Sequence, residues 1–264
     1  KHARARTPRL YRGPAGEWRL TTAERKRILL NNIYGVDIDP QAVEVTKLSL
    51  LLKVLEGESK ETVNNQLRLF HERALPDLGC NIKCGNSLIG PDFYKARQKS
   101  LFAEEEIYRI NAFDWRSVKT GFGDIIAEGG FDAVIGNPPW GADFTHAERS
   151  YLRERYSRVV ERMIDSYIYF VDQGVRLCTQ GGEIGFIVPS TILNQTDARP
   201  VRSLLLERGV TALVNLGQGV FGTKVLNTST IVISGPCPSG ESIVVDDLSG
   251  LPLDERPGAL RTCR

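Results

Sequence analysis

The residues best suited to chemistry lie in Phe131–Trp140, which reads Phe-Asp-Ala-Val-Ile-Gly-Asn-Pro-Pro-Trp. Its first half predicts a short buried strand, because Ala133, Val134 and Ile135 form an apolar run bounded by a glycine. Two prolines in series end the strand, since proline cannot donate to a sheet ladder. We therefore expect Asn137–Trp140 to form a stiff loop at the carboxyl end of a strand, where open α/β sheets bind ligands.

This loop suits methyl transfer to a planar exocyclic amine. Such an amine is a poor nucleophile because its lone pair is delocalised into the ring, and two acceptors aimed at its N–H groups would help it to attack. Asn137 offers a side-chain oxygen, and Pro138 offers a carbonyl on a backbone that cannot easily swing away. Trp140 offers a flat face on which an extruded base could stack. The alternative is a Pro-Pro turn with a surface tryptophan, and the strand context favours a functional loop.

These four loop residues resemble the catalytic motif of S-adenosylmethionine-dependent amino-methyltransferases: Asn137, Pro138, Pro139 and Trp140. From about Thr21 to Ile233, the chain resembles the gamma-class adenine-N6 DNA methyltransferases of type II (type IIG-like) restriction–modification systems. The resemblance implies a Rossmann-like α/β methyltransferase fold, with a mixed, mostly parallel sheet and helices on both faces. It implies S-adenosylmethionine as the cofactor and double-stranded DNA with a flipped adenine as the substrate.

A second predicted site follows Ile33–Val36, which reads as a buried strand with Asp37 at its carboxyl end. A carboxylate there can accept hydrogen bonds from both hydroxyls of a ribose. In the family, the acidic residue binds the cofactor ribose and the next apolar residue covers the cofactor adenine, which places these roles on Asp37 and Ile38. Helix capping is the competing role for Asp37, but Asp39 is better placed for it because it directly precedes Pro40.

The resemblance implies three further cofactor contacts. The turn Gly85–Leu88 looks like the family's third motif, in which Asn86, with Ser87 beside it, would meet the amino group of the cofactor adenine. An Asx-type turn is an equally good interpretation of that turn. Phe170 matches a position whose ring lies against the cofactor adenine opposite Ile38, although its residue type alone favours a core aromatic.

Phe221 completes the predicted base-binding residues. It lies in the glycine-punctuated loop Gly217–Leu226, which resembles a family loop whose aromatic ring packs on the extruded adenine. Phe221 would then hold the flipped base from the face opposite Trp140, and stacking would offset the cost of unstacking the base. The alternative is an ordinary core phenylalanine after a strand.

The elements that must position these residues alternate between strand and helix, which favours parallel βαβ units. We expect one helix capped by Thr21 or Thr22 and another, from Pro40, that is apolar enough to be buried. Further helices are expected over Ala147–Val160, from a cap at Asp165 to Gly181-Gly182, and over Asp197–Arg208. After the central strand we expect strands over Glu183–Val188, Val210–Leu216, Thr228–Ser234 and Ser242–Asp246. Cys80 and Cys84 flank a further short strand. They are expected to be core thiols, because no second ligand pair of zinc-site spacing accompanies them, so no metal site is predicted.

The composition limits the classes of protein to which the chain can belong. The chain has 264 residues, 41% hydrophobic and 25% charged, which is enough for one sizeable core. Its net charge of +2 gives no global nucleic-acid signature, so DNA binding must rest on local basic patches or on a partner segment. No stretch is long and apolar enough for a membrane span, and the five scattered cysteines fit free thiols in a reducing cytoplasm.

We divide the chain into a basic linker or arm (1–20), an incomplete methyltransferase domain (21–235) and a Pro/Gly-containing tail (236–264). The arm could contact phosphates, but a solvated linker is at least as good an interpretation. The family's first motif, a glycine-rich loop that binds the methionine part of the cofactor, has no match before Thr21. The tail is expected to lead to an absent specificity domain. We therefore expect the active enzyme to be longer, with an endonuclease as a fused or separate partner, and this chain alone to be inactive.

Two rival functions remain open on the sequence. One is an amino-methyltransferase acting on protein glutamine or on RNA, which shares the Asn-Pro-Pro-aromatic motif. The polar, helical inserts expected over Glu56–Asp77 and Pro91–Gly130 and the Phe221 loop favour DNA. The other is a non-catalytic DNA-binding remnant, which should not bind the cofactor.

Overall fold

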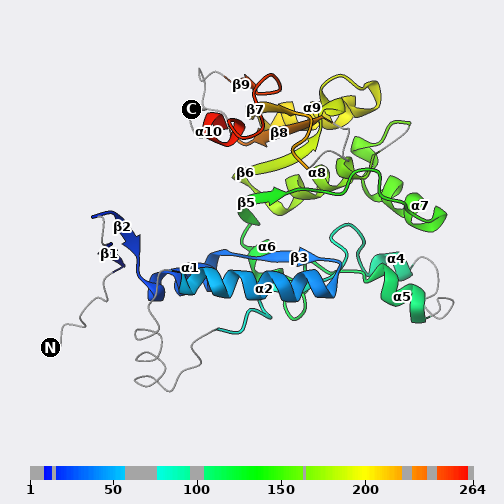
Figure 1. The fold of residues 1–264 in the computed structure, drawn as a ribbon. Helices are drawn as coiled ribbons and strands as arrows, with labels where there is room; N and C mark the ends of the chain where they lie inside the picture. The colour runs from blue at the N-terminus through cyan, green and yellow to red at the C-terminus, as the bar shows by residue number, and fades with distance from the viewer. Residues whose placement is uncertain are drawn as a thin grey trace. The chain divides into compact units, whose positions relative to one another are not determined.

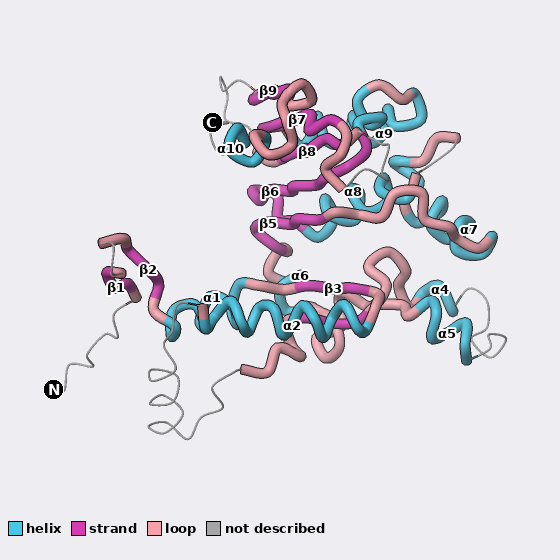
Figure 2. The backbone as a smooth tube through the Cα atoms, in the orientation of Figure 1, coloured by secondary structure: helices cyan, strands magenta, loops and turns pink. Residues whose placement is uncertain are grey.

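The computed structural model describes residues 9–13, 16–56, 76–95, 104–162, 165–221, 228–236 and 243–260. The chain divides into two compact units, and each is described by itself. The first comprises residues 1–87 and 104–111, and the second residues 88–103 and 112–264. Figures 1 and 2 show the elements of both units. Among the helices of the described ranges, none has the length and hydropathy needed to cross a membrane.

The first unit is built on two parallel strands, β3 (Gly35–Asp37) and β4 (Ile82–Cys84). Helix α2 (Pro40–Leu55) packs against both strands and against α1 (Thr22–Asn32), and the short helix α5 (Glu104–Ile110) also belongs to this unit. An antiparallel hairpin of β1 (Leu10–Arg12) and β2 (Trp18–Leu20) precedes α1. The core of the unit is a small aliphatic cluster of Leu29, Val43, Val54, Leu78 and Ile82.

Local capping sets the helix starts in this unit, as predicted. Thr21 caps α1 and Asp39 caps α2, with side-chain oxygens that accept a backbone N–H at 3.3 and 2.8 Å. The predicted start of the strand is two residues early, since Ile33 is the C-cap of α1 and β3 begins only at Gly35.

Burial in the first unit is less complete than predicted. Helix α2 was expected to be buried, but Leu48 and Leu52 are 55% and 59% exposed, because the helix turns only one face to the strands and α1. The assignment of Cys80 and Cys84 to the core is also wrong. Both thiols are exposed, since Cys80 lies in the turn before β4 and Cys84 is the last residue of that strand.

The second unit contains a five-stranded mixed sheet in the order β5-β6-β8-β7-β9. Its strands are β5 (Phe131–Gly136), β6 (Cys178–Pro189), β7 (Val210–Gly217), β8 (Ser229–Ser234) and β9 (Val244–Asp247). The pairs β5–β6 and β7–β9 are parallel, whereas β8 is antiparallel to both β6 and β7. Strands β6 and β7 therefore run in the same direction with β8 inserted between them. The mixed α/β fold class is confirmed.

The described α-helices of the second unit are α4 (Asp92–Lys95), α6 (Gly123–Ala127), α7 (His146–Arg155), α8 (Ser166–Leu177), α9 (Arg199–Arg208) and α10 (Arg256–Leu260). Helices α7 and α8 lie between β5 and β6 along the chain, and α9 lies between β6 and β7. Helix α8 packs against β5, β6 and α9 (Figure 1), and most of its residues are buried. A rigid, buried helix is thus placed beside the strand that leads into the Asn-Pro-Pro-Trp loop.

The predicted end of α8 at Gly181-Gly182 is wrong. The helix ends at Leu177, and β6 begins at Cys178 and runs through both glycines. Gly182 is needed for close strand packing, since a Cβ there would lie 2.5 Å from the Asp132 carbonyl oxygen of β5.

The prediction of a buried strand at β5 is also only partly right. Val134 is half-buried, but Ala133 is exposed and Ile135 is 86% exposed. Successive side chains of a strand point to opposite faces of the sheet, and Val134 faces α8, where its side chain lies close to Gly174. Ala133 and Ile135 point to the other face.

Candidate active site

The Asn-Pro-Pro-Trp loop follows β5 directly, as predicted. Asn137 is exposed, Pro138 is buried and Trp140 is half-buried. The residue before the loop must be small, because a Cβ at Gly136 would lie 2.7 Å from the ring of Phe186 on β6. That ring would also meet a Cβ at Gly174 of α8, at 2.8 Å. The strand end, the ring and the helix therefore pack tightly where the loop begins.

The second half of the loop is tied to the start of α8. The Gly141 N–H donates to Asp165 Oδ1 at 2.7 Å, and the Ala142 N–H donates to Ser166 Oγ at 3.1 Å. The Ser166 hydroxyl donates to the Pro139 carbonyl at 2.5 Å. Asp165 occupies the predicted N-cap position of α8, but its carboxylate makes no capping bond. It holds the loop instead.

Helix α7, which follows the loop, starts with a capping box between Thr145 and Glu148 and is shorter than predicted. Its side chains reach the segment that directly follows Ser87. Tyr151 Oη accepts from the Gly90 N–H at 3.1 Å and donates to Asp92 Oδ1 at 2.9 Å. Helix α7 thus holds Gly90 and Asp92 in place, close to where the second unit begins at residue 88.

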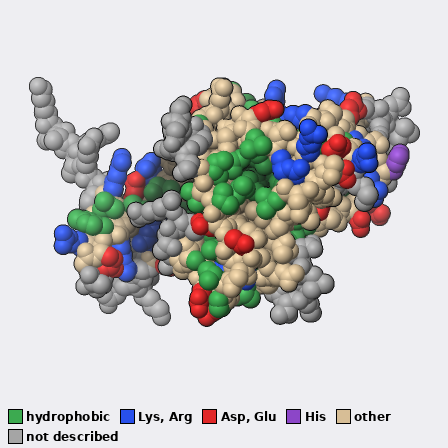
Figure 3. Space-filling view, turned by 90° about the horizontal axis from the view of Figure 1, so that it is seen from above, with side chains coloured by type: hydrophobic (Ala, Val, Ile, Leu, Met, Phe, Trp, Pro, Cys, Tyr) green, Lys and Arg blue, Asp and Glu red, His purple; other side chains and the backbone are tan. Residues whose placement is uncertain are grey.

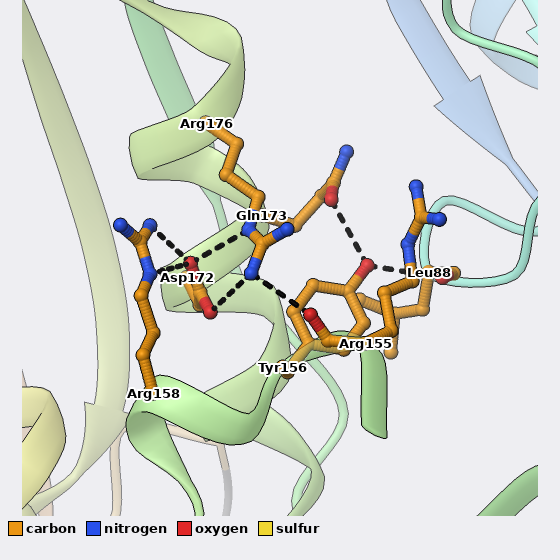
Figure 4. A network of polar contacts seen from close by, with 7 residues as sticks. All are labelled: Leu88, Arg155, Tyr156, Arg158, Asp172, Gln173 and Arg176. Carbon is orange, nitrogen blue, oxygen red and sulfur yellow. Dashed lines mark hydrogen bonds and ion pairs between the residues drawn. The ribbon is translucent and has the colours of Figure 1, made fainter. Parts of the chain in front are cut away.

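A buried polar network joins the end of α7 to α8 (Figure 4). The fully buried carboxylate of Asp172 accepts from Arg158 Nε at 2.8 Å and from Arg176 Nε at 3.0 Å. Arg176 also donates to the Arg155 carbonyl at 2.9 Å. Two arginines thus compensate one buried charge and lock α8, the helix that carries Ser166, against the segment following α7.

Tyr156 extends this network (Figure 4). Its hydroxyl lies 2.9 Å from the Leu88 carbonyl and 2.9 Å from Gln173 Oε1. A hydroxyl has one proton, so both contacts are satisfied when it donates to Leu88 and the Gln173 amide is turned to donate to it. Burial raises the pKa of Tyr156 well above its ordinary value.

The two predicted base-stacking residues are brought together. The rings of Trp140 and Phe221 lie 5.5 Å apart between centroids at 84°, an edge-to-face contact. Phe221 is 40% exposed, which does not fit the alternative of an ordinary core residue. The remaining residues of the predicted loop, 222–226, lie outside the described residues. A base between two parallel rings needs a centroid separation of about 7 Å, so this pair must open to admit one.

The start of the Phe221 loop is anchored by a buried arginine from the tail. Arg256 donates to the carbonyls at the end of β7 and in the turn after it, those of Leu216 and Gln218. It also donates to the carbonyls of Ser249 and Leu251. The C-terminal segment therefore stabilises this region: β9 pairs with β7, and Arg256 holds the chain that leads to Phe221.

The first unit brings the predicted ribose and adenine contacts to one edge. Asp37 and Cys84 are register partners in parallel strands, so Asp37-Ile38 and Gly85–Ser87 both follow carboxyl ends of adjacent strands. The Gly85 N–H donates to the Asp37 carbonyl at 2.8 Å, which joins the two turns. The Asp37 side chain is exposed and Ile38 is 49% exposed. An exposed carboxylate beside an exposed aliphatic side chain fits a nucleoside, as in dinucleotide sites.

The turn that carries Asn86 is held by its backbone. The Asn86 N–H donates to the Asn111 carbonyl at 2.7 Å, and Asn111 adopts a left-handed conformation with φ of 43°. Asn86 and Ser87 are both half-buried. Phe170 is half-buried on α8 in the second unit, whereas Ile38 lies in the first, so each half of the predicted adenine pocket is described by itself.

Fold and loops together define a class of protein. Strand ends that carry an acid, an asparagine turn and an Asn-Pro-Pro-aromatic loop are the arrangement expected of Rossmann-like amino-methyltransferases. A family profile described as Eco57I restriction-modification methylase matches residues 31–221, a range that includes every predicted site residue. The chain belongs to this family.

Two curated relatives agree with this assignment. The type II restriction enzyme and methyltransferase RM.Eco57I of Escherichia coli is 29% identical over 224 residues, which cover 82% of this chain and 20% of the relative. The adenine-specific methyltransferase PglX of Streptomyces coelicolor is 24% identical over 219 residues, which cover 80% of this chain and 17% of the relative. The chain therefore spans about a fifth of the length of these relatives.

A solved structure supports the fold. The nuclease-deletion mutant of the Type ISP restriction-modification enzyme LlaGI, in complex with a DNA substrate mimic, has a TM-score of 0.58 at 14% identity. The similarity covers 92% of this chain and 20% of that one.

Several residues that shape the site carry no sequence signal of their own. Asp165 looked like a helix cap, and Ser166 was not singled out. Their loop contacts join residues more than twenty positions apart, which local patterns do not reveal. Asp172 and Arg256 were missed for the same reason, since a buried charge is recognised only through partners that the fold brings to it.

Proposed function

We propose that the protein of which this chain forms part transfers a methyl group from S-adenosylmethionine to adenine N6 in double-stranded DNA, within a restriction–modification system. The observation that carries the proposal is the Asn-Pro-Pro-Trp loop, which leaves the carboxyl end of β5 with its backbone tied down and lies inside the family match. The description of the PglX relative as adenine-specific supports the choice of base.

In this proposal the loop acts on the amine directly. The exposed Asn137 side-chain oxygen and the Pro138 carbonyl accept hydrogen bonds from the two N–H groups of the target amine. These bonds draw the amine out of conjugation with the ring, so that its lone pair is available for attack. Trp140 and Phe221 separate and stack on the two faces of the flipped adenine.

The cofactor would be held at the other strand ends. The Asp37 carboxylate uses Oδ1 to accept from the Asp39 N–H at 2.8 Å, which orients it for the ribose hydroxyls. Ile38 and Phe170 would cover the adenine, and the turn of Asn86 and Ser87 would meet its amino group. When bound, S-adenosylmethionine supplies an electrophilic methyl group. The residues of this chain supply binding and orientation.

Asn137→Ala tests the proposal. Removing one acceptor from the reacting amine should lower kcat by about 10²–10³-fold, as for comparable donors and acceptors at reaction centres, with little change in cofactor affinity. Asn194→Ala, which removes an exposed asparagine after a short 3-10 turn, is the matched control. Methyl transfer to an adenine-containing duplex is measured with labelled S-adenosylmethionine.

The rival substrates are distinguished in the same assay. DNA, RNA and a glutamine-containing peptide are offered as methyl acceptors. Label on RNA or on glutamine, with none on DNA, would contradict the proposal. So would an Asn137→Ala protein that methylates DNA as fast as the Asn194→Ala control.

A further inference from the structure

The peptide groups on both sides of Trp140 are held by two adjacent residues at the start of α8. The Ser166 hydroxyl binds the carbonyl of Pro139, and the Asp165 carboxylate binds the N–H of Gly141. A third bond runs from the Ala142 N–H to Ser166 Oγ. We call these three bonds, made by Asp165 and Ser166, the clamp. Trp140 is therefore the residue between two fixed peptides.

We propose that Asp165 and Ser166 are positioning residues that hold Trp140 as the stacking platform for the target base. This inference rests on the proposed function, because the platform matters only if a base stacks on it. Neither residue is assigned to contact the base or the cofactor. They act through the loop backbone.

The bonding choice of Asp165 supports a role in the loop. An aspartate at an N-cap normally accepts a backbone N–H from the first turn of its own helix. Asp165 stands at that position and makes no such bond, and its oxygen instead accepts the Gly141 N–H at 2.7 Å. Gly141 has φ of 68°, a conformation that favours glycine, so the clamp holds the loop at its sharpest turn.

The clamp is attached to a rigid base. Ser166 is 2% exposed, and the helix it starts is locked by the ion pairs of Asp172 with Arg158 and Arg176. A positioning residue is effective only when its own side chain and backbone cannot move. The first turn of α8 meets this condition, whereas an exposed loop would not.

The Pro139 bond also bears on the amine. The Pro139 carbonyl directly follows the Pro138 carbonyl along the chain, and Pro138 is proposed to accept an N–H from the base. Releasing the Pro139 carbonyl would let the peptide planes after Pro138 rotate. A small misplacement of a catalytic group lowers the rate far more than it lowers binding.

The test uses three variants in the full-length protein. Ser166→Ala removes the bonds to Pro139 and Ala142. Asp165→Ala removes the acceptor for Gly141, and Asp165→Asn keeps an oxygen acceptor at the same place. Ser150→Ala is the control, because its hydroxyl bonds the His146 carbonyl at 2.9 Å within α7 and does not touch the loop.

We expect Ser166→Ala and Asp165→Ala each to lower kcat about tenfold while the KM for S-adenosylmethionine changes less than twofold. Asp165→Asn should restore most of the rate. The fluorescence of 2-aminopurine at the target position should change in the two alanine variants, since a loose platform alters the stacking of the flipped base. Thermal unfolding of each variant separates these effects from lost stability.

Three outcomes would overturn the inference. One is a kcat in both alanine variants equal to that of Ser150→Ala. Another is equal loss of kcat and cofactor affinity with no rescue by Asp165→Asn, which indicates a merely structural role. The third is unchanged 2-aminopurine fluorescence despite a lower rate. Failure of the wild type to methylate adenine in DNA would instead overturn the proposed function itself.

Discussion

The contact between Trp140 and Phe221 is the most informative single-residue feature of this chain. Both residues were predicted to stack on a flipped base, and they lie next to each other from segments about 80 residues apart. In the present arrangement the edge of one ring lies against the face of the other. Entry of a base would replace one aromatic contact with two, which gives the proposed flipping step a physical driving force.

Phe221→Ala should weaken the hold on the flipped base. Stacking on an aromatic side chain contributes about 1–3 kcal/mol per base, so we expect the fluorescence of 2-aminopurine at the target to move toward its fully unstacked value. Affinity for a duplex without a target adenine should not change. Tyr108→Ala, which removes a ring that is 77% exposed in the first unit, is the control. Equal fluorescence in both variants would remove Phe221 from the base site.

Tyr156 gives a pH-dependent prediction. Burial raises its pKa above the ordinary value of 10, so the folded state favours the protonated phenol. The contribution to stability is complete below about pH 10 and is lost as the pH rises through the folded pKa. Tyr156→Phe should cost about 1 kcal/mol at neutral pH, through the lost bond to Leu88, and should flatten the decline above pH 10.

Urea unfolding from pH 7 to 11 measures this effect. Tyr108→Phe, which changes a tyrosine that is 77% exposed, is the control and should leave the stability at neutral pH unchanged. A Tyr156→Phe curve parallel to the wild type above pH 10 would show that this phenol does not govern the alkaline decline.

Site residues could be predicted from the sequence where they lie side by side along the chain. Asn137–Trp140 and Asp37-Ile38 each sit in one unbroken stretch, next to a strand that the residue pattern indicates. Asp165 and Ser166 could not be found this way, because their partners lie on the loop more than twenty residues earlier. Thiol burial failed as well, since residue type predicts the average exposure and not the position relative to a strand end.

At the scale of elements, a glycine can end a helix or allow close packing, and the sequence did not show which role applies. Gly181-Gly182 looked like the end of a helix, but both lie in β6, where Gly182 lets β5 approach. Gly174 lies in the middle of α8, where glycine normally weakens a helix. It is explained by the Phe186 ring, which leaves no room for a Cβ.

Gly174→Ala should therefore destabilise the protein. Alanine would favour the helix by about 1 kcal/mol, but its methyl group would lie 2.8 Å from the buried Phe186 ring. Overpacking of this kind costs about 1–3 kcal/mol, so we expect a net loss measured by urea unfolding. Gly181→Ala is the control, because nothing lies within 4 Å of its added Cβ. A more stable Gly174→Ala protein would show that the ring shifts freely.

At the scale of the whole molecule, the strand–helix alternation predicted parallel βαβ units and the family resemblance implied a mixed sheet. The order of the strands came only from the structure. Strand β8 is last but one along the chain, yet it lies between β6 and β7. The exposed faces of β5 and α2 were also beyond the sequence, because periodicity shows which residues are apolar and not whether a neighbour covers them. Hydrophobic side chains also gather at the centre of the face that Figure 3 shows.

Charge is distributed unevenly over the chain. Six of the 34 Lys and Arg residues lie in the first 20 positions with only one of the 32 acids, so the remainder is slightly acidic. In the described hairpin, Arg12 lies over the Trp18 ring at 5.0 Å, and Trp18 is 63% exposed. The sequence left this arm without a role, and its charge makes it the natural place to look for a salt-dependent contact with phosphates.

The identity of the methylated atom tests the central claim most directly. The protein is incubated with a duplex of mixed sequence and labelled S-adenosylmethionine, the DNA is digested, and the nucleosides are identified by mass spectrometry. We predict label on N6-methyldeoxyadenosine alone, lost in Asn137→Ala and retained in Asn194→Ala. Label on a cytosine, or adenine methylation that persists without the Asn137 side chain, would contradict the account.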